Sequence, residues 1–440
     1  MDPALLGFLT VGVFLILAFT VRGSVIVWLV LVPTAAALAG GFGGSLSDMV
    51  VDGLRTVVPV AVMILFAVLY FGLMIDTGLF APLVRGLTQL VRDDPVRLCL
   101  VSAALPMLVA LDGDGSTTFL ISITALLPLH RRMGLQKTVL PGVVALAAGV
   151  MNMLPWGGPV ARAMAALRGD VEQLFTPLVP AMLAGIAWVF VAAWLIGRGE
   201  QRRLALAGNA APPALEAQQP APSPGAHTGW LFWFNAVLTT LLIALLFQDL
   251  YARLFPLPKI PPALLFMAAF AIALPVNRRG LQAQQDQFAS HAANAVLVTS
   301  LVLAAGVFTG VLNGTGMIKA MATTLAAAIP AQLSPWLSQI VAVTSMPLSL
   351  VFTADAYYFG MLPVFAETAR AVGGDPMAIG RAAALGQMTT GFPVSPLTAA
   401  TFVLLGLSEV SLREHQRFTF KWAFATTLVM AAVAWMTGAI

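Results

Sequence analysis

Carboxylates interrupt an apolar stretch of the sequence at a spacing that suits cation binding or proton transfer. In residues 98–130, Asp112, Asp114 and Ser116 alternate, as oxygen ligands do in calcium loops. The EF-hand pattern itself fails, because Thr117 stands where that loop needs glycine. Ionising both Asp112 and Asp114 in a medium of low dielectric constant costs free energy, because the two negative charges repel each other. We therefore expect one of them to carry a proton. The alternative is a solvated cap on a hairpin turn.

A guanidinium lies inside a second apolar stretch, residues 138–168. Arg162 follows a Gly-Gly-Pro sequence and begins a half-helix. Because a guanidinium keeps its charge, it needs an anion at that depth. A ligand carboxylate would satisfy it, aided by the amide groups of the helix start. The alternative is a structural ion pair with Asp112 or Asp114.

A third carboxylate, Asp355, interrupts the stretch 336–369 together with Thr353, Tyr357 and Tyr358. Tyrosine hydroxyls here would donate hydrogen bonds to a polyanionic ligand; the alternative for Tyr358 is an interfacial aromatic anchor.

The candidate binding residues combine these groups with the polar, Pro and Gly residues of the neighbouring breaks, where glycine lets a ligand approach the backbone. They are Asp112, Gly113, Asp114, Gly115, Ser116, Thr117, Asn152, Trp156, Gly157, Gly158, Arg162, Thr353, Asp355, Tyr357, Pro393 and Ser395. Asp112, Asp114 and Asp355 are also the candidates for carrying a proton or contacting a metal ion. Asp76 is expected to cap a turn. The four histidines, His130, His227, His291 and His415, are expected to be solvated.

The composition requires that these groups sit in a membrane. The chain has 440 residues, of which 59% are hydrophobic and 10% charged, against roughly 25% charged in soluble domains. This excludes a cytosolic enzyme, a disordered chain and a nucleic-acid-binding module. The single cysteine, Cys99, excludes a disulfide framework and a cysteine-type zinc site. We therefore predict an all-α polytopic membrane protein.

Apolar runs divide the chain into two similar halves, 1–197 and 229–440, joined by a proline-rich linker, 198–228. Each half is predicted to make five crossings plus one re-entrant hairpin, and to contain one broken helix. The hairpins are 98–130 and 336–369, and the broken helices are 138–168 and 377–407. Unwound backbone is tolerated at membrane depth only where it lines a cavity or is buried in protein.

The halves also repeat a motif, since Gly72–Leu79 resembles Gly310–Met317. An odd number of crossings gives the repeats opposite topology, and inverted repeats with broken helices indicate a secondary transporter. Most of the 23 Lys and Arg residues fall on the side of the linker, so the linker is expected in the cytoplasm and both termini outside. No P-loop is present, so ATP-driven transport is not expected. A channel and an intramembrane aspartyl enzyme remain open alternatives, the latter because Asp114 and Asp355 are able to meet.

The longest motifs resemble a known family, the bacterial citrate–metal:proton symporters of the ion transporter superfamily. They include Asp112–Phe119 (DGDGSTTF), Leu127–Arg132 (LPLHRR), Met151–Pro159 (MNMLPWGGP), Phe352–Gly360 (FTADAYYFG) and His415–Trp422 (HQRFTFKW). The resemblance covers nearly the whole chain except the linker.

It implies symport of protons with citrate, or a related tricarboxylate, complexed with Mg²⁺ or Ca²⁺. It further implies no permanently bound cofactor, a homodimer, an elevator-type transporter fold and a place in the bacterial cytoplasmic membrane. A sodium-coupled di- or tricarboxylate carrier, or an anion efflux protein of the same fold, is the alternative. The candidate site has one cation, Arg162, and three carboxylates. This charge balance suits a polyanion that is bound to a metal ion better than a free polyanion.

Overall fold

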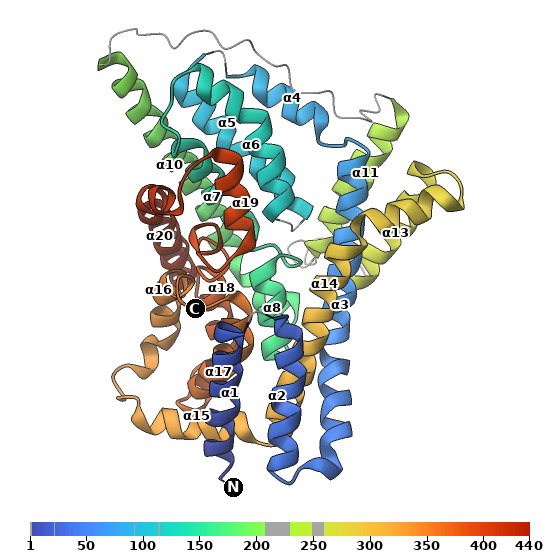
Figure 1. Ribbon diagram of the computed structural model, residues 1–440, viewed down its shortest axis with the longest axis vertical. Helices are drawn as coiled ribbons and strands as arrows, with labels where there is room; N and C mark the ends of the chain where they lie inside the picture. Colours follow the sequence, from blue (N-terminus) through green and yellow to red (C-terminus); the bar gives the residue numbers. More distant parts are fainter. Residues whose placement is uncertain (1, 22, 92, 113–114, 207–228, 249–258) are drawn as a thin grey trace.

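The computed structural model describes residues 2–21, 23–91, 93–112, 115–206, 229–248 and 259–440. Within these ranges every regular element is a helix, which confirms the predicted all-α class (Figure 1). The predicted site residues Gly113 and Asp114, the side chain of Asp112, and linker residues 207–228 lie outside the described residues.

The helices of the first half are α1 (Pro3–Thr20), α2 (Val25–Ala39), α3 (Leu46–Asp76), α4 (Ala81–Gln89), α5 (Pro95–Val109), α6 (Gly115–Arg132), α7 (Val139–Met151), α8 (Gly158–Leu167), α9 (Val171–Leu174) and α10 (Val179–Leu206). Those of the second half are α11 (Trp230–Leu246), α13 (Pro262–Asn277), α14 (Leu281–Gly314), α15 (Met317–Ala328), α16 (Leu337–Leu348), α17 (Leu362–Ala371), α18 (Pro376–Ala384), α19 (Ala399–Ser408) and α20 (Leu412–Met436). A π-helical segment, η5 (Ala356–Met361), precedes α17.

Within the described residues, four helical segments are long and apolar enough to cross a membrane, namely Gly43–Asp76, Val171–Leu206, Leu281–Gly314 and Leu412–Met436. Shorter apolar helices accompany them, including α1, α2, α7 and α13. A membrane-spanning helix needs about 20 apolar residues, so a shorter helix spans the bilayer only where the bilayer is thinner, or serves as one part of a broken segment. The chain is a multi-pass membrane protein.

The long helices α3 and α14 pack side by side (Figure 1) and form the largest helix–helix contact. Their approach depends on glycines, since a Cβ atom built on Gly53 would lie 2.1 Å from the carbonyl oxygen of Gly306. A Cβ on Gly310 would lie 2.5 Å from the carbonyl oxygen of Met49. Small residues at a crossing let two membrane helices approach backbone to backbone. These glycines therefore set the distance between α3 and α14.

Replacing Gly53 by alanine is expected to destabilise the protein by about 1–3 kcal/mol, because the new methyl group forces α3 and α14 apart. The measurement is the thermal unfolding midpoint of the detergent-solubilised protein. The matched control is Gly12→Ala, at a position in α1 where a new Cβ meets nothing within 4 Å. Equal midpoints for the two variants would contradict the role given to this crossing.

The helix order of the second half follows that of the first. Helix α3 ends at Asp76 and is followed by Gly78 with φ 72°, while α14 ends at Gly314 and is followed by Gly316 with φ 75°. The repeated motif therefore has one backbone conformation in both places, with glycine where a positive φ is required. This correspondence supports our proposal that the halves are repeats of opposite topology.

Helix ends fall at each interruption that the sequence indicates. Non-helical or tightly turned segments separate α5 from α6, α7 from α8, α16 from η5, and α18 from α19. The interruptions of the two halves also meet, since a Cβ on Gly149 would lie 2.8 Å from the carbonyl oxygen of Thr389. The broken segments thus pack together in the interior.

The predicted linker begins too early in the sequence. Helix α10 continues to Leu206, past position 198. The continuation is anchored by Glu200, which is buried, accepts from the backbone N–H of Gln136 at 2.9 Å and pairs with Arg203 at 2.8 Å. Arg203 also donates to the carbonyl oxygen of Gly134 at 2.6 Å. Residues 198–206 therefore continue the helix instead of belonging to the linker, and Glu200 and Arg203 anchor it to the loop 134–136.

Candidate functional site

A cavity of about 160 Å³ lies where both breaks approach α3 and α14. Six of the predicted residues line it, namely Gly115, Asn152, Trp156, Gly157, Gly158 and Arg162. Its other walls come from Ile64, Val68, Ala161, Asn294, Val298, Leu301, Val302, Met388, Phe392, Thr398 and Ala400. Among these lining residues of the described chain, Arg162 alone is charged.

The break between α7 and α8 is shaped by hydrogen bonds of the Asn152 side chain to backbone groups. Asn152 donates through Nδ2 to the carbonyl oxygen of Met388 at 2.6 Å and accepts through Oδ1 from the N–H of Gly158 at 3.3 Å. A Cβ on Gly157 would lie 2.0 Å from the carbonyl oxygen of Asn152. Only glycine fits there, and Asn152 ties the first break to the second.

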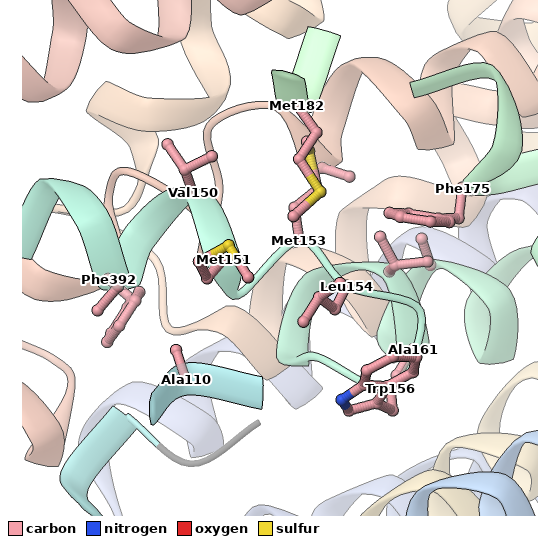
Figure 2. Close-up of a cluster of buried hydrophobic side chains, with 14 of the residues drawn as sticks. Ala110, Val150, Met151, Met153, Leu154, Trp156, Ala161, Phe175, Met182 and Phe392 are labelled. Atoms are coloured by element: carbon pink, nitrogen blue, oxygen red, sulfur yellow. The ribbon is translucent and has the colours of Figure 1, made fainter. Parts of the chain in front are cut away.

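Trp156 ties the same break to the tip of the first hairpin. Its Nε1 donates to the carbonyl oxygen of Leu111 at 2.8 Å. Its ring stacks on Phe71 of α3, with ring centroids 5.6 Å apart. Figure 2 shows Trp156 beside Ala161, with Leu154 and then Met153 further back along the same break, and Ala110 on another turn. An aromatic ring that also donates one hydrogen bond holds three elements in register around the cavity.

Arg162 forms an ion pair with Asp355 of the second half. Its Nε lies 2.7 Å from Asp355 Oδ1, and the two side chains are 11% and 19% exposed. A second guanidinium nitrogen donates to the carbonyl oxygen of Gly158 at 3.2 Å. The alternative considered from the sequence was a structural pair of Arg162 with Asp112 or Asp114; among the described side chains its partner is Asp355. The second tip reaches α8 because η5 packs against it.

The remaining predicted residues lie outside the cavity lining. Thr353 accepts from the N–H of Ala356 at 3.2 Å. Tyr357 is fully buried, and its hydroxyl has no hydrogen-bond partner within the described ranges. Ser395 donates to the carbonyl oxygen of Ser349, and Pro393 contributes its carbonyl oxygen to a bond with His415. Ser116 and Thr117 belong to the first turn of α6, next to Gly115.

Sequence reasoning missed Asn294 and was wrong about three histidines. Asn294 lines the cavity from α14, and an amide directly before the apolar run 295–298 was the available signal. His415 and His130 are buried rather than solvated. His415 Nε2 lies 2.8 Å from the carbonyl oxygen of Pro393 and so positions the second break. His291 is partly buried and pairs with Asp76 at 2.7 Å.

No group of three or more His, Cys, Asp or Glu side chains able to hold a metal ion occurs in the part of the chain that the structure describes. Asp355 is the one predicted metal contact whose side chain is described, and Arg162 engages it.

Broken helices around a cavity whose lining includes a buried arginine are typical of a membrane transporter. The chain belongs to the citrate transporter family, whose model matches residues 4–386. This confirms the family resemblance of the sequence motifs. The protein is a secondary transporter by family and not an enzyme.

Two relatives from Bacillus subtilis (strain 168) match over nearly their whole length. One, named a citrate transporter, is 44% identical over 442 residues, which is 99% of this chain and 99% of the relative. The other, named a Mg²⁺/citrate complex secondary transporter, is 41% identical over 446 residues, with the same coverage of both chains. The crystal structure of the Alcanivorax borkumensis YdaH transporter has a similar fold, with a TM-score of 0.59 at 17% identity, covering 100% of this chain and 98% of that one.

Replacing Trp156 by phenylalanine is expected to keep the stacking on Phe71 but lose the bond to the Leu111 carbonyl oxygen. A lost hydrogen bond of this kind is worth about 1 kcal/mol, so transport is expected to fall about fivefold with little change in the unfolding midpoint. Substrate uptake and thermal unfolding measure the two effects. The control is Trp230→Phe, which changes an exposed tryptophan at the start of α11. Unchanged uptake by Trp156→Phe would contradict the positioning role.

Proposed function

We propose that this protein carries citrate, complexed with a divalent cation such as Mg²⁺ or Ca²⁺, across the bacterial cytoplasmic membrane in symport with protons. The observation that carries the proposal is the pairing of Arg162 with Asp355 beside the cavity. The name of the second Bacillus relative supports the choice of a metal–citrate complex.

The charge balance explains why the substrate would be a complex. Free citrate is a trianion at neutral pH, and a buried polyanion needs matching positive charge. Arg162 is the single cation in the described lining, and Asp355 already neutralises it. A divalent cation that travels with citrate supplies most of the missing positive charge. One citrate carboxylate then replaces Asp355 on Arg162.

The displaced Asp355 carboxylate must itself be neutralised, because an unpaired charge at this depth is costly. A proton or the incoming metal ion would serve, and Asp112 and Asp114 are the other candidates for either role. We further propose that the binding region of hairpins and broken helices moves as an elevator, and that the protein is a homodimer. In this topology both termini lie outside and the linker lies in the cytoplasm.

The test is citrate uptake into proteoliposomes driven by a proton gradient or by a sodium gradient, each with and without Mg²⁺ or Ca²⁺. Proton-driven uptake that requires the divalent cation is the expected result. Metal-independent, sodium-driven uptake would instead identify a sodium-coupled carboxylate carrier of the same fold. Citrate movement only out of preloaded vesicles would identify an efflux protein.

A further inference from the structure

One buried glutamine, outside the predicted binding residues, joins the second hairpin to the second break. Gln387 follows α18 and is 1% exposed. Its Oε1 accepts from the hydroxyl of Ser349, and its Nε2 donates to the carbonyl oxygen of Phe352 at 3.4 Å. Because a carbonyl oxygen only accepts, the amide nitrogen has to face Phe352, which fixes the orientation of the amide. The side chain is therefore bonded to the segment that leads into the tip of the hairpin.

The backbone of the same residue holds the other end of the tip. The hydroxyl of Tyr358, a fully buried residue, donates to the carbonyl oxygen of Gln387 at 2.9 Å. Phe352 and Tyr358 each lie three residues from Asp355 in the sequence, one before it and one after it. Gln387 therefore holds both ends of the short segment that carries the Asp355 carboxylate. That carboxylate lies 2.7 Å from Nε of Arg162.

Glycines on both sides of Gln387 let the second break lie directly against the end of α16. A Cβ atom on Gly386 would lie 2.5 Å from the backbone nitrogen of Met346. A Cβ on Gly391 would lie 2.1 Å from the hydroxyl oxygen of Ser349. A side chain at either position would push the break and the hairpin apart. The hydrogen bonds of Gln387 depend on this close approach.

The residue after Gln387 connects the same junction to the first break. Met388 has φ 58°, a left-handed backbone conformation that costs free energy in a residue other than glycine. Such a conformation persists only where the surrounding contacts impose it. The carbonyl oxygen of Met388 accepts from Asn152 at 2.6 Å, and Met388 lines the cavity beside Arg162. Residues 387 and 388 therefore join the tip, the second break and the first break at one point.

We propose that Gln387 is a positioning residue, which holds the Asp355 carboxylate against Arg162 and so sets how readily a substrate carboxylate displaces it. Gln387 is not among the residues that line the cavity in the described part of the chain, so it acts through the tip. Without its two side-chain bonds the tip is held less firmly, and the pair of Asp355 with Arg162 weakens. This inference rests on the proposed function in one respect, since Asp355 has to take part in transport.

The variant that tests this role is Gln387→Met, which keeps the approximate size of the side chain and removes both of its hydrogen bonds. The matched control is Gln416→Met. Gln416 of α20 donates to the carbonyl oxygen of Val394 at 2.9 Å, so its amide also binds the second break but not the tip. Each variant is made in the wild-type protein and in Asp355→Asn. The measurement is initial uptake of metal-complexed citrate into proteoliposomes.

Gln387→Met is expected to lower uptake at least about fivefold in the wild-type protein, which corresponds to the loss of one buried hydrogen bond. In the Asp355→Asn background the same change should lower uptake less than about twofold, because the positioned carboxylate is already absent. Gln416→Met should change uptake by the same factor in both backgrounds. Equal factors for Gln387→Met in the two backgrounds would overturn the proposal, because a purely structural role does not depend on Asp355.

The unfolding midpoint of the purified, citrate-free protein gives a second measurement, which does not require transport. Coupling between two residues makes the shift of the double variant differ from the sum of the single shifts. We expect such a difference for Gln387→Met with Asp355→Asn, and additive shifts for Gln416→Met with Asp355→Asn. Additive shifts in both pairs would also overturn the proposal.

A milder variant serves if Gln387→Met does not fold. Tyr358→Phe removes only the hydrogen bond to the Gln387 carbonyl oxygen and takes the place of Gln387→Met in both comparisons, with the same expected and contrary results. A wild-type protein that takes up no citrate would refute the proposed function. The unfolding midpoints would still decide whether Gln387 and Asp355 are coupled.

Discussion

Replacing Arg162 by alanine is expected to abolish citrate uptake, by a factor of at least about one hundred. The guanidinium is 11% exposed. It is the one charged group in the described lining of the cavity of about 160 Å³ between the broken helices, which we call the transport cavity. Removing one partner of a buried charge pair costs about 3–5 kcal/mol, because the remaining charge stays buried without compensation. In the loaded state that remaining charge is a citrate carboxylate. The measurement is initial uptake into proteoliposomes at matched protein content.

Two further variants make this result specific. Arg162→Lys keeps the charge but loses the planar fork that engages Asp355 and the Gly158 carbonyl oxygen together, so most of the uptake should be lost there too. Arg55→Gln removes an exposed arginine of α3 and should leave uptake unchanged. Normal uptake by Arg162→Ala would refute the role assigned to this residue.

Replacing Asp355 by asparagine is expected to reduce uptake at least about tenfold and to change what drives it. Asp355 is the partner of Arg162 at 2.7 Å. Its displacement by citrate releases a carboxylate that must take up a proton or face the metal ion. The neutral amide needs neither, so the remaining uptake should lose its dependence on the proton gradient or on the divalent cation. Uptake measured against each of these separately tells which role Asp355 has.

The control for Asp355 lies on the adjoining helix. Glu367 of α17 pairs with Arg370 of the same helix at 3.0 Å, away from the transport cavity. Glu367→Gln should keep both the proton and the metal dependence. If Asp355→Asn behaves like Glu367→Gln in both respects, Asp355 takes no part in coupling.

The breaks in the helices were predictable because local chemistry determines them. Asn152, Gly157 and Gly158 mark the end of α7 and the start of α8, and the structure shows why, since a Cβ on Gly157 would overlap the Asn152 carbonyl oxygen. Arg162 was recognisable because a permanent positive charge inside an apolar helix requires an anion beside it. Both inferences use only neighbouring residues.

Contacts between distant segments were not predictable in the same way. The sequence offered several carboxylates to Arg162, and only the packing of η5 against α8 selects Asp355. The burial of His130 and His415 likewise depends on neighbours supplied by α5 and by the second break. Asn294 reaches the cavity because α14 packs along α3 through glycines. Each of these depends on partners far away in the sequence.

The ion pair of Arg162 and Asp355 also bears on the journey that a carrier makes without cargo. In the elevator that we propose, the empty binding region returns across the membrane after the cargo is released. A lone guanidinium carried through the full transmembrane field would gain or lose about 2.3 kcal/mol for every 100 mV. With Asp355 held at 2.7 Å, the two charges travel together and cancel. In the proposed elevator, this pair therefore adds no net charge of its own to the return step, so the membrane voltage neither helps nor hinders its passage.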